Sequence, residues 1–270
     1  MRKPCTKRPT PNAAAAIGLL VLAGSCAPAW ASQPLITDDT GTQGSGGNQL
    51  EFALSHDHTE VGGMVEHLRT LPITYTRGLS DTLDISAGIS HAWIHSSTGG
   101  DSGGNGNPSL GAKWRVYDDT QAGTSFAVKP EILFPVSSGR ESAGLGTGRT
   151  SGGLTLILTQ ELPFGAVHFN AGVARERYRN AADNPDTTIV RASLAPVWDL
   201  AQKWKLALDV GTETAHAAGT SVRSNFVEIG AIWSPNNDLD FALGLVHTTD
   251  NNFPGATTRT AMAGLTWRYR

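Results

Sequence analysis

The sequence predicts an all-β fold, a twelve-stranded antiparallel up-and-down transmembrane β-barrel, and three features of the chain lead to this class. Runs in which apolar and polar side chains alternate recur along the sequence, at roughly the ten-residue length that a tilted strand needs to cross hydrocarbon. The connections between these runs are alternately short and long. The last run, Ala261–Arg270, is apolar at every second residue and carries the aromatics Trp267 and Tyr269 near its end.

The N-terminal segment has the features of a secretory signal peptide. Basic residues at the start precede an apolar run from Ala13 to Ala23, which is too short for a transmembrane helix, and a small-x-small pattern ends at Ala31. We therefore expect residues 1–31 to be removed by cleavage between Ala31 and Ser32.

A lipoprotein site at Cys26 is the alternative for this segment. A lipoprotein box has a branched aliphatic residue three positions before the cysteine, whereas Ala23 stands there. Both cysteines, Cys5 and Cys26, lie in the segment to be removed. The mature chain would then have neither a disulfide framework nor a cysteine-based metal site.

Export changes the charge balance. The full sequence has 21 Lys plus Arg and 24 Asp plus Glu; without Arg2, Lys3, Lys7 and Arg8 the basic count is 17 and the net charge −7. This charge argues against a nucleic-acid partner, which needs clustered positive charge. No later segment approaches the roughly 18 consecutive apolar residues of a spanning helix. A mean hydropathy of −0.19 suits a barrel with one lipid face and one wet face.

Residues 32–47 are polar and glycine-rich, and we expect an extended periplasmic lead-in there, followed by the barrel in residues 48–270. Each predicted strand has an apolar set at every second position. The strands are Gln49–Ser55, Leu68–Thr76, Leu83–Trp93, Ser109–Tyr117, Phe126–Phe134, Leu154–Leu162, Val167–Arg175, Ile189–Trp198, Trp204–Thr212, Phe226–Ser234, Leu239–His247 and the C-terminal run. An even number places both ends of the chain on the periplasmic side.

Short and long connections alternate along the chain, as in an outer-membrane barrel with tight periplasmic turns and long external loops. A soluble Greek-key sandwich has no reason to sort its loops in this way. The short connections follow even-numbered strands and are Gly78–Asp81, Asp118–Gly123, Pro163–Gly165, Asp199–Lys203 and Pro235–Asp238. The long ones follow odd-numbered strands and are His56–His67, His95–Pro108, Pro135–Thr150, Tyr178–Thr188, Glu213–Arg223 and Thr248–Thr257.

Aromatic residues gather at the strand ends that this scheme places in the periplasm, where an inner girdle is expected. A sandwich core that uses tryptophan as filler would spread them along the strands. The predicted girdle consists of Trp114, Trp198, Trp204, Trp233, Trp267 and Tyr269. The C-terminal pattern of Gly264, Trp267 and Tyr269 also resembles the sorting signal of outer-membrane barrels, except that Arg270 follows the final aromatic.

The polar set of each strand should face the lumen, and it mixes both signs of charge. One interpretation is a set of ion pairs that brace the wall; the other is a polar eyelet that sets permeability. A barrel of twelve strands encloses a lumen roughly 10–14 Å in diameter once the inward side chains are subtracted. This diameter leaves room for a narrow pore. The predicted lumen-lining residues are Lys113, Arg115, Lys129, Glu131, Arg191 and Asp209.

Catalytic and metal sites are only weakly indicated. His95–Ser96 and Arg223–Asn225 faintly resemble pieces of the outer-membrane phospholipase, but the joined motif of that family is absent. His56 and His58 fall on one side of an extended segment, at a spacing that can hold a metal. Histidines in wet loops are more often simply solvated, so no metal, cofactor or catalytic residue is assigned.

Several phrases resemble the family called "putative MetA-pathway of phenol degradation". They are Pro34–Gly44 with Gly47–Glu51, Pro72–Asp84, Leu110–Arg115, and Phe134–Gly139 followed by Gly144–Gly148. The resemblance implies an outer-membrane channel or transporter linked to aromatic catabolism, with no catalytic residues to carry over.

We therefore expect a bacterial outer-membrane channel, not an enzyme, for passive passage of small molecules such as hydrophobic or aromatic compounds. Its expected partners are the lipid bilayer, a small-molecule cargo, and the barrel-assembly machinery, which would read the C-terminal strand. The alternative is a non-conducting barrel that displays loops or supports the envelope.

Overall fold

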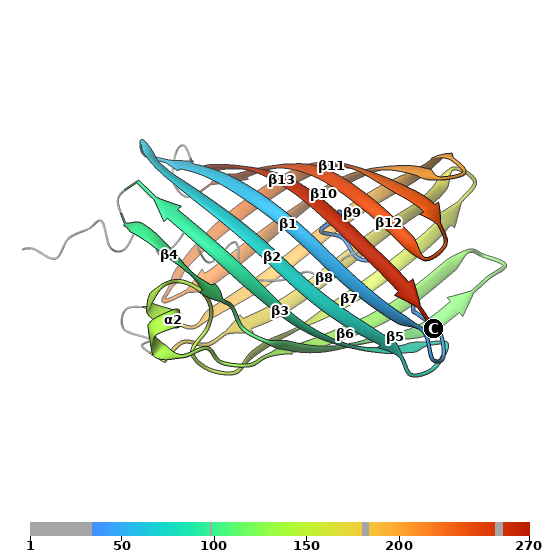
Figure 1. The fold of residues 1–270 in the computed structure, drawn as a ribbon, viewed down its shortest axis with the longest axis horizontal. Coiled ribbons are helices and arrows are strands. Elements are labelled where there is room, and N and C mark those ends of the chain that lie inside the picture. The colour runs from blue at the N-terminus through green and yellow to red at the C-terminus, as the bar shows by residue number, and fades with distance from the viewer. Residues whose placement is uncertain (1–33, 98, 180–183, 252–255) are drawn as a thin grey trace, which may run out of the picture.

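The chain forms a closed antiparallel β-barrel (Figure 1). The computed structural model describes residues 34–97, 99–179, 184–251 and 256–270. Each strand pairs with the next along the chain, except that β5 pairs with β3 and not with β4, and β1 pairs with both β2 and β13, which closes the ring. The strands are β1 Asn48–Val61, β2 Met64–Gly78, β3 Leu83–Ser96, β4 Gly100–Asn105, β5 Ser109–Asp119, β6 Thr124–Leu133, β7 Ser151–Leu162, β8 Gly165–Glu176, β9 Thr187–Ala201, β10 Trp204–Ala217, β11 Thr220–Asn236, β12 Leu239–Asp250 and β13 Thr257–Tyr269.

The predicted twelve-stranded barrel is confirmed, with one extra strand. The lower half of β3 pairs with β5, from Leu83 opposite Trp114 to Gly88 opposite Ser109. Its upper half pairs with the short β4, from His91 opposite Asn105 to Ser96 opposite Gly100. The strand β4 therefore lies inside a connection that the sequence analysis treated as a loop.

Apolar side chains point outward, as a barrel in lipid requires. Leu243 is 65% exposed, Ile229 53% and Leu54 50%, although each lies within a fully paired strand. The alternate residues point into the lumen, where Asp209 and Glu228 have no exposed surface. No helix in the described ranges is long and apolar enough to span a membrane.

The prediction of a long loop is wrong for two connections, because most of their residues belong to strands. The connection His56–His67 is a hairpin that turns at Gly62 and Gly63, both with positive φ, and Glu213–Arg223 is a hairpin that turns between Ala217 and Thr220. Above the lipid band the outward side chains face water, so the apolar alternation that identifies a strand stops. The backbone ladder continues regardless.

The connection between β6 and β7 lies at the extracellular end of the barrel (Figure 1). It contains the helix α2, Ser138–Ser142, and its Leu145 packs inside the barrel against Leu68 and Ile94. The Asn107 side chain holds both ends of this connection, donating to the carbonyls of Phe134 at 2.7 Å and Thr147 at 2.9 Å and accepting from the Thr147 N–H at 2.8 Å.

The N-terminal lead-in lies inside the barrel rather than below it. Figure 1 shows the start of the described chain within the ring of strands, from which it descends to β1 at the periplasmic end. We call residues Pro34–Gly44 the lumenal segment. The predicted signal peptide, residues 1–31, and its cleavage site between Ala31 and Ser32 lie outside the described residues.

Candidate functional site

The lumenal segment begins with apolar contacts to the wall formed by β9 to β12. Leu35 forms a buried cluster with Ala195, Val197 and Ala207. Pro34 occupies space left by missing side chains, since a Cβ on Gly230 would stand 2.5 Å from Pro34 Cγ. The wall is therefore shaped to receive this end of the segment.

Thr37 fixes the next part of the segment to β10. Its N–H donates to Asp209 Oδ2 at 2.6 Å, and its hydroxyl donates to Asp209 Oδ1 at 2.7 Å. The same hydroxyl lies 2.6 Å from Ser193 Oγ on β9. Hydrogen bonds to a charged group contribute about 1.5–3 kcal/mol each, so this buried carboxyl is a strong anchor.

Asp38 bridges two lysines on the opposite wall. Its carboxylate lies 2.8 Å from Lys113 Nζ and 2.6 Å from Lys129 Nζ, with side chains that are 6%, 17% and 13% exposed respectively. On β8, two strands from β6, the Asn170 amide accepts from the Asp38 N–H at 2.6 Å and donates to its carbonyl at 2.9 Å. Asp38 therefore ties β5, β6 and β8 to one point inside the barrel.

The segment then descends along polar side chains to the periplasmic rim. The Thr40 hydroxyl lies 2.5 Å from Ser125 Oγ, and its N–H donates to Thr159 Oγ1 at 3.2 Å. The Gln43 N–H donates to the carboxylate of Asp84 at 3.0 Å. The contacts described for Thr37 to Gln43 are all hydrogen bonds or ion pairs. These contacts can therefore be broken and remade without covalent change.

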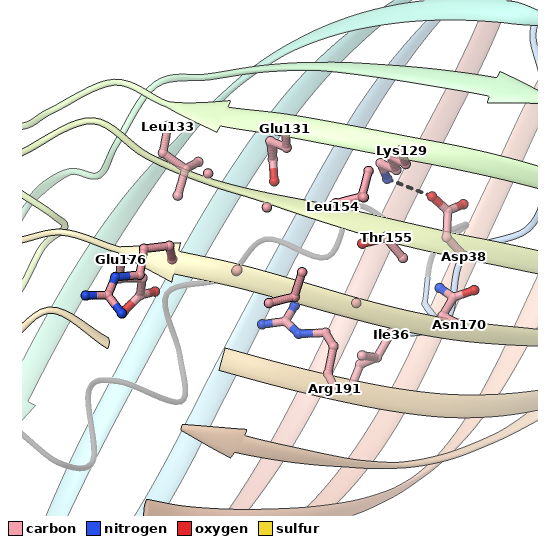
Figure 2. Close-up of a pocket in the computed structure, with 16 residues that line it drawn as sticks. Ile36, Asp38, Lys129, Glu131, Leu133, Leu154, Thr155, Asn170, Glu176 and Arg191 are labelled. Atoms are coloured by element: carbon pink, nitrogen blue, oxygen red, sulfur yellow. Dashed lines mark hydrogen bonds and ion pairs between the residues drawn. The ribbon is translucent and has the colours of Figure 1, made fainter. Parts of the chain in front are cut away.

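A small cavity lies beside the segment on its extracellular side. Figure 2 shows Asp38 and Ile36 at one edge, with Lys129, Glu131 and Arg191 around it. It holds about 60 Å³ of free space. Since one water needs at least about 10–15 Å³ of such space, there is room for a few waters but not for an aromatic compound beside the segment.

The structure brings most of the predicted lumen-lining residues to the lumenal segment. Lys113, Lys129 and Asp209 contact it directly, while Glu131 and Arg191 line the cavity. Arg191 also pairs with Glu213 Oε2 at 3.0 Å.

Arg115 stands apart from this group. It pairs with Asp118 at 3.3 Å and donates to the Asp81 carbonyl near the periplasmic rim. The predicted lumen-lining residues are therefore not assembled as one ring that includes Arg115. The two lysines converge instead on a carboxylate from the segment.

The predicted girdle residues lie on the outer face toward the periplasmic ends of their strands. The ring centroids of Trp204 and Trp233, which stack, are 6.1 Å apart, and those of Trp267 and Tyr269 are 4.7 Å apart. Trp198 stacks on Phe164 at 6.1 Å, and Trp114 is 56% exposed.

The weak catalytic candidates do not converge. His95 and Ser96 are consecutive in β3, so their side chains point to opposite faces, and His95 Nδ1 hydrogen-bonds Asp101. At the β10–β11 hairpin, His216 Nδ1 lies 2.7 Å from Ser221 Oγ, but this is an exposed pair directly opposite in the strand register.

The residues that sequence reasoning missed are Thr37, Asp38 and Thr40. They stand in a polar stretch with no periodicity, so only their place in a family motif drew attention to them. Glu228 was also missed as a contact residue. It lies directly opposite Asp209 in the register of β10 and β11, fully buried, and so adds a second carboxyl beside the segment.

Comparisons with known proteins agree with this architecture. A family model described as "Putative MetA-pathway of phenol degradation" matches residues 37–268. No curated protein sequence matches.

Three solved structures show the same kind of barrel. The COG4313 outer membrane channel from Pseudomonas putida F1 is 13% identical, with a TM-score of 0.66 over 86% of this chain and 98% of that one. The β domain of the Bordetella autotransporter BrkA is 13% identical, with a TM-score of 0.55 over 83% and 99%. The NanC porin is 9% identical, with a TM-score of 0.52 over 80% and 98%. At these identities the likeness concerns the fold.

Proposed function

The chain belongs to the "putative MetA-pathway of phenol degradation" family, and from this premise we propose that it is a channel of the bacterial outer membrane for passive passage of small molecules. The structures that share its fold include a protein described as an outer membrane channel and another described as a porin. The lipid bilayer surrounds the barrel. The barrel-assembly machinery reads its C-terminal strand, after the signal peptide of residues 1–31 has directed export.

The observation that carries this proposal is the way the lumen is filled. The lumenal segment is joined to the barrel only at the periplasmic rim, where it enters β1 at Asn48. Its other contacts with the wall, among them those to Asp209, Lys113 and Lys129, are non-covalent and reversible. Displacement of this segment opens the lumen without unfolding any strand.

The cargo class that we propose is hydrophobic or aromatic compounds. The family description links the family to phenol degradation, and the segment itself presents Leu35 and Ile36 to the lumen wall and cavity. A molecule that replaces these side chains meets apolar surface at the level of β9 and β10.

A non-conducting barrel is the second candidate, and one observation favours it. With the segment in place, the cavity beside it holds about 60 Å³ of free space. A barrel that never releases the segment would display its loops and support the envelope without passing cargo. In either case Lys113, Lys129 and Asp209 line the lumen and anchor the lumenal segment. We propose no enzymatic activity and no cofactor.

Recordings from planar bilayers separate the two candidates. The channel function predicts discrete current steps from the purified protein, and a complete absence of steps over a wide voltage range would remove it. The cargo class is tested by uptake of labelled phenol and other aromatic compounds in a deletion strain, with the gene restored on a plasmid. Equal uptake in the two strains would refute the proposed cargo class.

A further inference from the structure

Histidines form a row on the outer face of the barrel at its extracellular end. Along β1 the outward side chains change from the apolar Leu54 to His56 and then His58. His67 on β2 lies directly opposite His58, and His95 on β3 lies directly opposite His67. The row therefore crosses three neighbouring strands, beyond the apolar band.

Two of these imidazoles face each other at a distance that suits a shared metal ion. His58 Nδ1 lies 3.5 Å from His67 Nδ1, with ring centroids 4.8 Å apart and planes tilted by 47°. Two nitrogens bound to a tetrahedral Zn²⁺ at 2.0–2.1 Å stand about 3.3 Å from each other. The observed separation is long for a hydrogen bond, whose usual range ends near about 3.2 Å, so a proton shared between the rings explains the geometry less well.

Glu60 orients the first imidazole. Its Oε1 lies 2.8 Å from His58 Nε2 near the tip of the β1–β2 hairpin. A carboxylate on Nε2 keeps the proton there and leaves the lone pair of Nδ1 directed at His67. Ligating histidines in metal sites have this second-shell partner.

Neighbouring rings restrict the second imidazole. His56 stacks on His67 with centroids 5.5 Å apart and planes within 12°. His95 stacks on the other side at 6.3 Å, and its Nδ1 is taken by Asp101. His67 is thus held between two rings, and the backbone ladder of β1 and β2 fixes its place opposite His58.

From this geometry we propose that His58 and His67 bind a divalent transition-metal ion, Zn²⁺ or Cu²⁺, on the extracellular surface of the barrel. Imidazole nitrogens are preferred ligands of both ions. In the described part of the chain, no group of three or more His, Cys, Asp and Glu side chains could hold a metal. Water therefore completes the coordination of this two-histidine site, and Asp57, which points into the lumen, takes no part.

The test is titration of the intact protein, purified in detergent with a tag free of histidine, with Zn²⁺ followed by calorimetry. The wild type is expected to bind one ion. His58→Gln and His67→Gln are expected to lower the association constant by at least about tenfold, and Glu60→Gln by roughly 10–100-fold as a second-shell change. His247→Gln is the matched control, an outward histidine at the extracellular end of β12, and is expected to leave binding unchanged.

A spectroscopic readout identifies the ligands. The electron paramagnetic resonance spectrum of Cu²⁺ bound to the wild type is expected to show hyperfine coupling to two imidazole nitrogens. The spectrum of either single variant is expected to show coupling to one. A difference in mobility between heated and unheated samples on SDS gels establishes that each variant is folded. The proposal is overturned if the wild type binds no Zn²⁺ even at about 1 mM, or if His58→Gln and His67→Gln bind as the wild type does.

Discussion

Removal of the Asp38 carboxylate should vacate the lumen. This carboxylate lies 2.8 Å from Lys113 Nζ and 2.6 Å from Lys129 Nζ, and all three side chains are largely buried. In Asp38→Ala both ammonium groups stay buried without that partner whenever the lumenal segment is in place. Deleting one member of a buried ion pair costs about 3–5 kcal/mol for this reason.

The lower end of that range applies here. Lys113 still donates to the Asp39 carbonyl at 3.0 Å, and water can reach the lysines from the adjoining cavity. A loss of about 3 kcal/mol lowers the ratio of occupied to vacated lumen by roughly 100-fold. Single-channel recordings should therefore show Asp38→Ala in a high-conductance state for a far larger fraction of time than the wild type.

The matched control is Asp118→Ala, which makes the same change of charge. Asp118 pairs with Arg115 at 3.3 Å near the periplasmic turn and is 41% exposed, so its loss should leave the currents as they are. If folded Asp38→Ala and Asp118→Ala both give wild-type currents, the ion pairs of Asp38 do not hold the segment and the reasoning fails.

Three further changes test the packing of the segment, the lipid face and the connection between β6 and β7. Gly230→Leu, whose Cβ would stand 2.5 Å from Pro34 Cγ, should raise the open fraction without removing a polar contact; unchanged currents would count against this packing. Leu156→Arg, on the outward face of β7, should cost roughly 2–4 kcal/mol in urea unfolding from vesicles if it lies near midplane, and a cost near zero would place it outside the lipid. Asn107→Ala removes three hydrogen bonds of about 1 kcal/mol each. It should speed protease cleavage near α2 on intact cells, and an unchanged rate would show that other contacts hold the connection between β6 and β7.

The barrel could be predicted from the sequence because lipid imposes a rule on every second residue. Leu154, Leu156 and Leu158 all face outward on β7, and their period of two is visible without any knowledge of the fold. The same rule stops where the wall leaves the lipid. The hairpin from His56 to His67 therefore looked like a loop, although its backbone pairing is continuous.

The contacts of the lumenal segment could not be predicted from local pattern. Asp38 meets Lys113 and Lys129 only because the barrel closes, which brings together residues 75 and 91 positions away in the chain. Alternation alone predicted that both lysines face inward. Their partner lies in a stretch without periodicity, so the choice between paired and open lysines needed the three-dimensional structure.

A disulfide between Thr37→Cys and Ser193→Cys tests the central claim most directly, because the lumenal segment must then lie where the structure places it. The two side-chain oxygens are 2.6 Å apart, and both natural cysteines, Cys5 and Cys26, precede the described chain. In the Asp38→Ala background, oxidation should form the bond and suppress the high-conductance state, and a reductant should restore it. If no bond forms in the folded protein, or if the current is the same with the bond closed, the segment does not occupy and block the lumen.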